Sequence, residues 1–133
     1  MSLVEELKQQ HKIILDKLDQ VRSIGSSTAE SLKILEEVKS TLFSHIKKED
    51  ELLYPALNQA AATDPSLKAY LEMYAMDMQE VSTEVLDFYG KHTGPAAKPG
   101  HPDFIYDFER VLYNLQRRIK NEENSLYVKF SKL

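Results

Sequence analysis

The sequence predicts an all-α protein, an up-down-up-down four-helix bundle, and three observations support this class. Four long segments carry apolar residues at spacings of three and four, the period of an amphipathic helix. No segment alternates with the period of a β-strand. Three of the five prolines and two of the four glycines fall between residues 94 and 102, so the rest of the chain is free to form helices.

The first two predicted helices are joined by a short connection. The first covers residues 2–24 and ends near Gly25. The second covers residues 27–58, and Ser27 and Glu30 at its start have the spacing of a capping box. Its predicted apolar stripe consists of Leu35, Val38, Leu42, Leu52 and Ala56.

The third and fourth predicted helices are separated by a Gly/Pro-rich loop. The third opens at Asp64, an N-cap, followed by Pro65 at the first helical position, and it ends near Gly90. Residues 91–100 form the loop. The fourth helix opens near residues 102–103 and runs almost to residue 133. Four amphipathic helices with mostly short connections pack as an antiparallel bundle.

Composition excludes several classes of function. A length of 133 residues suits one domain, residues 1–133. The net charge of −4 disfavours a nucleic-acid partner, and there is no run of 18 apolar residues to span a membrane. The sequence has no cysteine, which excludes disulfides and thiolate metal ligands. Because the first residues are acidic and amphipathic rather than signal-like, we expect a cytoplasmic protein.

Polar side chains interrupt the apolar stripes at positions that should face the core. They are His11 in the first helix, His45 and Glu49 in the second, Tyr74 and Met78 in the third, and Arg118, Glu122 and the adjacent Glu123 in the fourth. Counted from one end of the bundle, they lie within about 8 Å of a common height. Burying unpaired charges there would cost several kcal/mol each, so a metal ion or a buried arginine must compensate.

The second and fourth helices resemble each other. Residues 46–54, Ile-Lys-Lys-Glu-Asp-Glu-Leu-Leu-Tyr, are similar to residues 119–127, Ile-Lys-Asn-Glu-Glu-Asn-Ser-Leu-Tyr. The two helices therefore look like related halves of one design. In this alignment His45 corresponds to Arg118.

These features resemble the hemerythrin family, the HHE cation-binding domains, over nearly the whole chain. The resemblance rests on His11, on residues 45–55 (His-Ile-Lys-Lys-Glu-Asp-Glu-Leu-Leu-Tyr-Pro) and on residues 119–127. It implies a four-helix bundle that holds a non-haem di-iron centre, which binds oxygen reversibly or serves as a sensor.

The resemblance also implies a set of ligands. His11 and His45 match histidine ligands of the first and second helices. Glu49 matches the first bridging carboxylate. Glu123 matches the second bridging carboxylate, with Glu122 as the alternative for that role.

The chain departs from the family pattern on the third and fourth helices. Tyr74 and Met78 stand where the third helix should present histidines, and Arg118 stands where the fourth should present one. An arginine stays protonated and cannot ligate a metal. We therefore expect Arg118 to pair with Glu49 and with one of the two fourth-helix glutamates, as a cation in place of metal charge.

The incomplete ligand set predicts no full di-iron centre. It leaves at most a single metal ion, iron or zinc, on His11, His45, Glu49 and either Glu122 or Glu123. The expected function is a cation-binding or sensing module without catalysis of its own, which could bind oxygen or another small ligand through a metal. The alternative is a metal-free regulatory or scaffolding bundle that binds a protein partner.

Two further pairs of residues receive simpler interpretations. We expect His92 and His101, in or beside the Gly/Pro loop, to be exposed. We expect Tyr54 and Tyr127 to cap the core with hydroxyl groups in contact with water.

Overall fold

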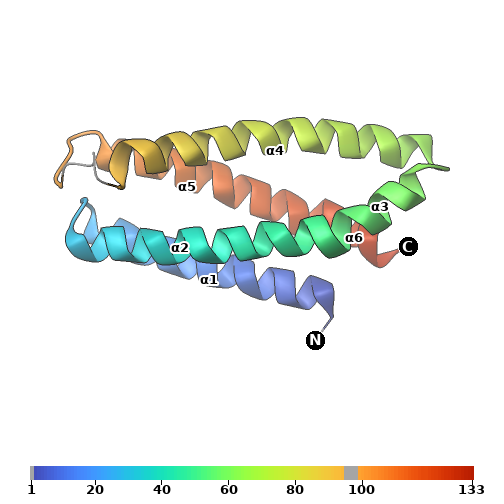
Figure 1. Ribbon diagram of the computed structural model, residues 1–133, viewed down its shortest axis with the longest axis horizontal. Coiled ribbons are helices and arrows are strands. Elements are labelled where there is room, and N and C mark those ends of the chain that lie inside the picture. The colour runs from blue at the N-terminus through green and yellow to red at the C-terminus, as the bar shows by residue number, and fades with distance from the viewer. Residues whose placement is uncertain (1, 95–98) are drawn as a thin grey trace.

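The protein is a bundle of four antiparallel helical rods in up-down-up-down order (Figure 1). The computed structural model describes residues 2–94 and 99–133, so residues 95–98 of the predicted loop lie outside the described residues. The first rod packs along the second and the third along the fourth, and the two termini lie at the same end of the bundle. Within the described residues, every helix is too short or too polar to cross a membrane.

The four predicted helices are confirmed, but two of them are interrupted by a π turn. The first rod is α1 (Leu3–Ile24); the second is α2 (Ala29–Lys48), the π turn η1 (Glu49–Leu53) and α3 (Tyr54–Ala61); the third is α4 (Pro65–His92); and the fourth is α5 (Phe104–Asn121), the π turn η2 (Glu122–Leu126) and α6 (Tyr127–Ser131). The rods end within a few residues of the predicted bounds. The π turns were not predicted.

The start of α2 is capped one residue later than predicted. The cap is Thr28, whose Oγ1 accepts a hydrogen bond from the backbone N–H of Ser31 at 3.1 Å. The Ser31 Oγ accepts in return from the Thr28 N–H at 2.7 Å and donates to the Ser26 carbonyl at 2.8 Å. Ser31 is fully buried, and its short side chain completes the capping box within the core. The predicted pair of Ser27 and Glu30 is therefore not used.

Each π turn begins at a buried glutamate and is followed directly by a tyrosine. The N–H of Tyr54 bonds to the carbonyl of Glu49, and the N–H of Tyr127 bonds to the carbonyl of Glu122. In the second rod, Pro55 has no N–H to offer to the carbonyl four residues earlier, which favours the wider turn there. The repeat seen in the sequence is thus also a repeat in backbone structure.

The π turn η1 moves the apolar stripe of the second rod by one residue. The stripe predicted to continue through Leu52 and Ala56 passes instead through Leu53 and Leu57, which are both 0 % exposed. Leu52 is 55 % exposed. A π turn contains an extra residue, and this residue rotates everything that follows it around the helix axis. The sequence prediction assumed an uninterrupted α-helix and was wrong at these two positions.

The core consists of two apolar clusters with a polar layer between them. One cluster lies towards the α1–α2 connection and includes Ile14, Val38, Val81 and Leu115. The other lies towards the α3–α4 connection and includes Leu7, Leu53, Leu71 and Leu126. On α1, the buried His11 falls between the two clusters. The polar positions of all four rods therefore meet at one level, as the sequence predicted.

The Ser31 box provides a test of the fold. Replacing Ser31 with alanine removes the side-chain acceptor of the Thr28 N–H, which keeps only its bond to the Ser26 carbonyl at 3.0 Å, and removes the hydroxyl donor to that carbonyl. We expect a loss of about 1–2 kcal/mol in the free energy of unfolding. Thermal or urea unfolding measures this loss. Ser40→Ala, at an exposed site on the same helix, is the control and should change stability by less than about 0.5 kcal/mol. Equal effects of the two substitutions would contradict the role of the box.

Candidate metal centre

Two histidines and a glutamate converge in the polar layer of the bundle. The Nε2 atoms of His11 and His45 lie 3.0 Å apart. Oε2 of Glu122 lies 2.8 Å from Nε2 of His11 and 3.6 Å from Nε2 of His45. Each of the three residues is 2 % exposed. Within residues 2–94 and 99–133, this is the one group of three or more metal-ligating side chains close enough to share an ion.

Outer hydrogen bonds orient the two imidazole rings. Nδ1 of His11 lies 2.9 Å from Oε2 of Glu123, and Nδ1 of His45 lies 2.9 Å from Oε1 of Gln10. With each Nδ1–H donated outward, Nε2 of each ring faces the centre of the cluster. In the neutral imidazole this nitrogen offers its lone pair to a metal, an arrangement typical of metal-binding histidines. Gln10 was missed in the sequence. Its position next to His11 was the only signal, and it was too weak to use.

The structure reverses the order of preference between the two fourth-helix glutamates. Glu122 is the buried member of the cluster, whereas the side chain of Glu123 is 32 % exposed and contacts only the outer nitrogen of His11. The matching alignment position on the second rod is Glu49, which also begins a π turn. Glu122 therefore takes the inner position that the resemblance had assigned first to Glu123.

Arg118 contacts the opposite oxygen of the same carboxylate. Its Nε donates to Oε1 of Glu122 at 2.9 Å, and the arginine is 6 % exposed. Burial alone would raise the pKa of Glu122, but hydrogen bonds from His11 and His45 and the charge of Arg118 hold that pKa well below its usual range. The predicted buried pair thus forms with Glu122. The predicted second pair, with Glu49, is not among the ion pairs of the described residues.

The carboxylates also affect His45. Burial by itself lowers the pKa of this imidazole, but hydrogen bonds to Glu122 and Glu49 outweigh burial and raise the pKa to about 9. The ring is therefore a cation in the metal-free protein at neutral pH. A metal ion would replace this proton as the positive charge between the carboxylates.

Glu49 is fully buried and only half satisfied. Its Oε2 accepts a hydrogen bond from the Tyr127 hydroxyl at 2.9 Å and lies 3.5 Å from Nε2 of His45. Its Oε1 has no hydrogen-bond partner. A buried carboxylate oxygen without a donor is costly, and a cation is the kind of group that would satisfy it.

The tyrosines of the layer are more deeply buried than the sequence suggested. Tyr127 is 1 % exposed, and its hydroxyl contacts the cluster instead of water. Burial and then the charges of Glu122 and Glu49 raise the pKa of Tyr127. The phenol therefore keeps its proton, and its O–H group donates a hydrogen bond. The hydroxyls of Tyr54 and Tyr74 are buried without a hydrogen-bond partner. The predicted wet caps at Tyr54 and Tyr127 are therefore wrong, because the π turns carry these side chains inward.

The distances in the cluster fit one metal ion. Ligands about 2.0–2.2 Å from a metal lie roughly 3.0–3.4 Å from one another, which is close to the separations among His11, His45 and Glu122. The place beyond Glu122 is taken by the Arg118 guanidinium, and the third rod offers Tyr74 and the partly buried Met78. His11, His45 and Glu122 therefore have the spacing of ligands on one ion, and a guanidinium, which cannot ligate a metal, stands on the other side of Glu122.

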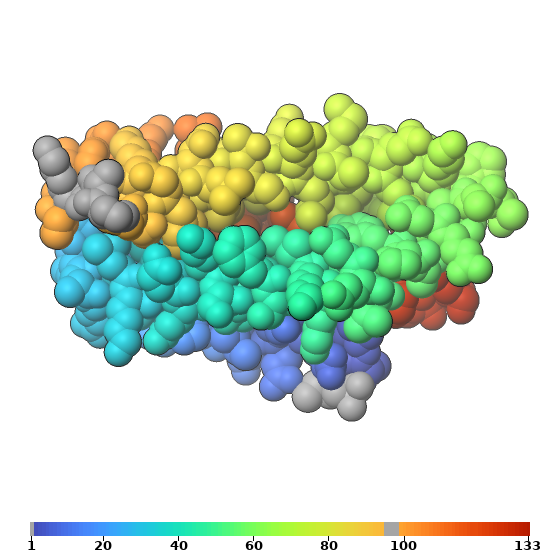
Figure 2. All heavy atoms as spheres, viewed as in Figure 1, coloured from blue at the N-terminus to red at the C-terminus, as the bar shows by residue number. Residues whose placement is uncertain are grey.

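An apolar groove leads from the surface to Arg118. It runs between α2 and α4, has a volume of about 250 Å³, and is lined by Phe43, Ile46, Leu86 and Leu115 among others, with Arg118 on its lining too. Figure 2 shows it as a hollow between these helices with atoms of α5 at the bottom. One end of the groove is thus formed by the guanidinium that contacts Glu122.

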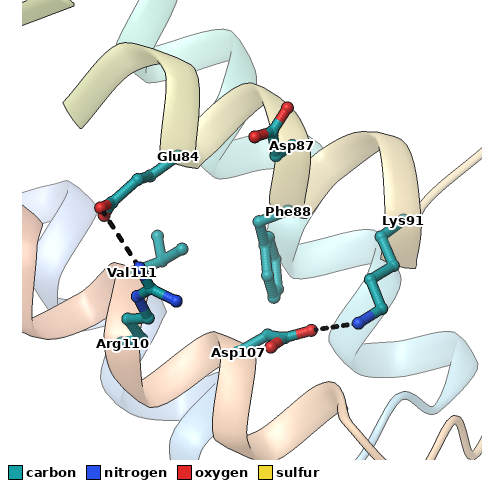
Figure 3. Close-up of a pocket in the computed structure, with 7 residues that line it drawn as sticks. All are labelled: Glu84, Asp87, Phe88, Lys91, Asp107, Arg110 and Val111. Atoms are coloured by element: carbon teal, nitrogen blue, oxygen red, sulfur yellow. Dashed lines mark ion pairs between the residues drawn. The ribbon is translucent and has the colours of Figure 1, made fainter. Parts of the chain in front are cut away.

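A second cleft lies away from the cluster, between the C-terminal half of α4 and the start of α5 (Figure 3). Its charged groups pair across it, Lys91 with Asp107 at 3.0 Å and Glu84 with Arg110 at 3.8 Å. Nearby, His92 is 2 % exposed and its Nε2 lies 2.7 Å from Asp107. The predicted exposure of His92 is therefore wrong: α4 continues two residues past Gly90 and carries the ring into the bundle.

Fold and cluster together define a four-helix bundle with a potential metal site enclosed at mid-length. The family model of the hemerythrin HHE cation binding domain matches residues 2–130. The chain therefore belongs to this family, as the sequence resemblance indicated. The comparison with curated proteins gives no match, and the comparison with solved structures gives none.

The buried ion pair generates a stability prediction. Arg118→Leu leaves the Glu122 carboxylate without its guanidinium, and we expect the metal-free protein to lose about 3–5 kcal/mol in the free energy of unfolding. Arg117→Leu is the matched control, because Arg117 carries a more exposed pair with Asp77 and should change stability by about 1 kcal/mol or less. Urea unfolding in EDTA measures both. A neutral Arg118→Leu would contradict the importance of the pair.

Proposed function

We propose that this protein is a single-metal member of the HHE family, a cation-binding or sensing module. The observation that carries the proposal is the convergence of His11 Nε2, His45 Nε2 and Glu122 Oε2 at the spacing of ligands on one ion. Two histidines and one carboxylate are the donors typical of mononuclear non-haem iron, and zinc accepts the same donors. The unsatisfied oxygen of Glu49 adds a nearby negative charge that favours a cation.

Arg118 supports one ion in place of two. Its guanidinium supplies positive charge on the side of Glu122 that faces away from the histidines. In the sequence repeat it occupies the position that corresponds to His45. A second metal ion on this side of Glu122 would need a nitrogen ligand at the position of Arg118. We therefore propose that the guanidinium stands in place of that second ion.

We infer that the protein binds a metal ion and does not catalyse a reaction. His11, His45 and Glu122 are almost fully buried, and neither the groove nor the cleft described above is lined by any of them. A large substrate therefore has no visible route to the cluster. The apolar groove beside Arg118 suits a small neutral molecule such as oxygen, which is the ligand class we propose for the metal-bound protein.

Metal analysis tests the proposal. Protein purified without chelator, or reconstituted with iron or zinc, should hold one ion per chain. His11→Ala and His45→Ala should each reduce metal affinity by at least tenfold, because each removes a ligand. His101→Ala, a histidine outside the cluster, is the control and should keep full occupancy. Two ions per chain would contradict the single-metal proposal, and none under any loading condition would contradict metal binding altogether.

A second candidate is the metal-free bundle that binds a protein partner. It is favoured by one observation: Arg118 and protonated His45 already neutralise the buried carboxylates without a metal. Thermal unfolding with EDTA and with added iron or zinc separates the candidates. A metal-binding protein gains stability from an ion in excess, by about 2.7 kcal/mol at a hundredfold excess over Kd, whereas a metal-free bundle shows no shift.

Arg118→His provides a further prediction. The substitution removes the guanidinium and places an imidazole opposite His45 in the repeat, near the Glu122 Oε1 that Arg118 now holds. We expect metal binding to strengthen or the metal content to rise above one ion per chain. Equilibrium dialysis measures the content, with Arg117→His as the matched control. Unchanged binding would contradict the view that Arg118 replaces a metal.

A further inference from the structure

The Tyr127 hydroxyl lies at the centre of the polar layer, in contact with every member of the cluster. Its oxygen is 2.9 Å from Oε2 of Glu122, 3.3 Å from Nε2 of His11 and 3.5 Å from Nε2 of His45. The phenol ring stacks on the His11 ring, with centroids 5.6 Å apart and planes 10° from parallel. We propose that Tyr127 is a fourth ligand of the metal, which it binds as a phenolate. This inference rests on the proposed single-metal function.

The four atoms form a compact tetrahedron with edges between 2.8 and 3.6 Å. The three edges that Tyr127 adds, 2.9, 3.3 and 3.5 Å, match the three edges among His11, His45 and Glu122, which are 3.0, 2.8 and 3.6 Å. A tetrahedron with such edges has its centre about 2 Å from each corner, which is the length of a metal bond to a histidine nitrogen or an anionic oxygen. The separations are therefore those expected of four donors around one ion.

In this geometry Glu49 is the acceptor of the Tyr127 proton. On metal binding, the O–H proton of Tyr127 would pass to Oε2 of Glu49, which already accepts the hydrogen bond at 2.9 Å, and the phenolate oxygen would then hold the ion. No electrons are transferred. A cation bonded directly to the oxygen favours this loss of the proton despite the neighbouring carboxylates. Glu49 thus acts beside the ion, and the fourth ligand comes from a residue that the sequence resemblance does not assign.

The chain contains a matched control in Tyr54. It occupies the corresponding position of the repeat, five residues after Glu49 as Tyr127 is five residues after Glu122. Its hydroxyl is also buried, but it makes no hydrogen bond to any side chain of the cluster. Tyr54→Phe therefore removes an equivalent hydroxyl from the same layer without removing a proposed ligand.

The test uses the full-length protein loaded with ferric iron, with the visible spectrum and the iron content measured on the same sample. A phenolate bound to ferric iron gives a visible charge-transfer band, and resonance Raman excitation in that band enhances tyrosine ring modes. We expect the band and one iron per chain in the unmodified protein and in Tyr54→Phe. In Tyr127→Phe we expect the band to be lost while iron still binds, with affinity reduced about tenfold or more.

The visible band and the iron content together distinguish a failure of the tyrosine ligand from a failure of the single-metal proposal. Iron bound without a band, or a band that persists in Tyr127→Phe, overturns the tyrosine ligand and leaves the single-metal proposal standing. An unmodified protein that binds zinc but no iron overturns the iron phenolate alone, and one that binds neither metal overturns both proposals. If Tyr127→Phe does not fold, ring-deuterated tyrosine is incorporated into the unmodified protein. The enhanced Raman modes must then shift if a tyrosine is the ligand. Unshifted modes overturn the tyrosine ligand.

Discussion

The structure depends on one buried carboxylate whose two oxygens are held from opposite sides. Glu122 presents Oε1 to the Arg118 guanidinium and Oε2 to His11, and it is 2 % exposed. An isolated carboxylate at this depth would be neutralised by a proton, but hydrogen bonds from the two histidines and the charge of Arg118 hold its pKa well below the usual range. Arg118, His11 and Tyr127 contact its oxygens at 2.8–2.9 Å, and Nε2 of His45 lies 3.6 Å from Oε2.

This arrangement explains why an apolar bundle tolerates a polar level across its middle. The layer separates two hydrophobic clusters, each of which is packed by all four rods. The Arg118 guanidinium supplies positive charge on one side of the Glu122 carboxylate, and the two histidines lie on the other side. The polar level is thus held by contacts among its own side chains.

The candidate site could be predicted well in outline and less well in detail. His11, His45 and Arg118 were found because a polar residue in an apolar stripe is conspicuous in the sequence. The choice between Glu122 and Glu123 was not decided, because adjacent residues on a helix differ by only a rotation that depends on the local backbone. Tyr127 and Gln10 were missed as contacts of the cluster, since an aromatic or amide side chain on a helix gives no signal of its partners on other helices.

The sequence by itself determined the four helices, their antiparallel order and the level at which their polar residues meet, because these follow from periodicity and helix-ending residues that act locally. Tertiary structure decided which side of each helix faces inward past the π turns. Each π turn inserts one residue, and the rotation it causes moves Leu53 inward in place of Leu52 and carries the Tyr127 hydroxyl to the histidines. Whether a helix accommodates that extra residue depends on packing against the other rods, which is a property of the assembled bundle and not of any one segment.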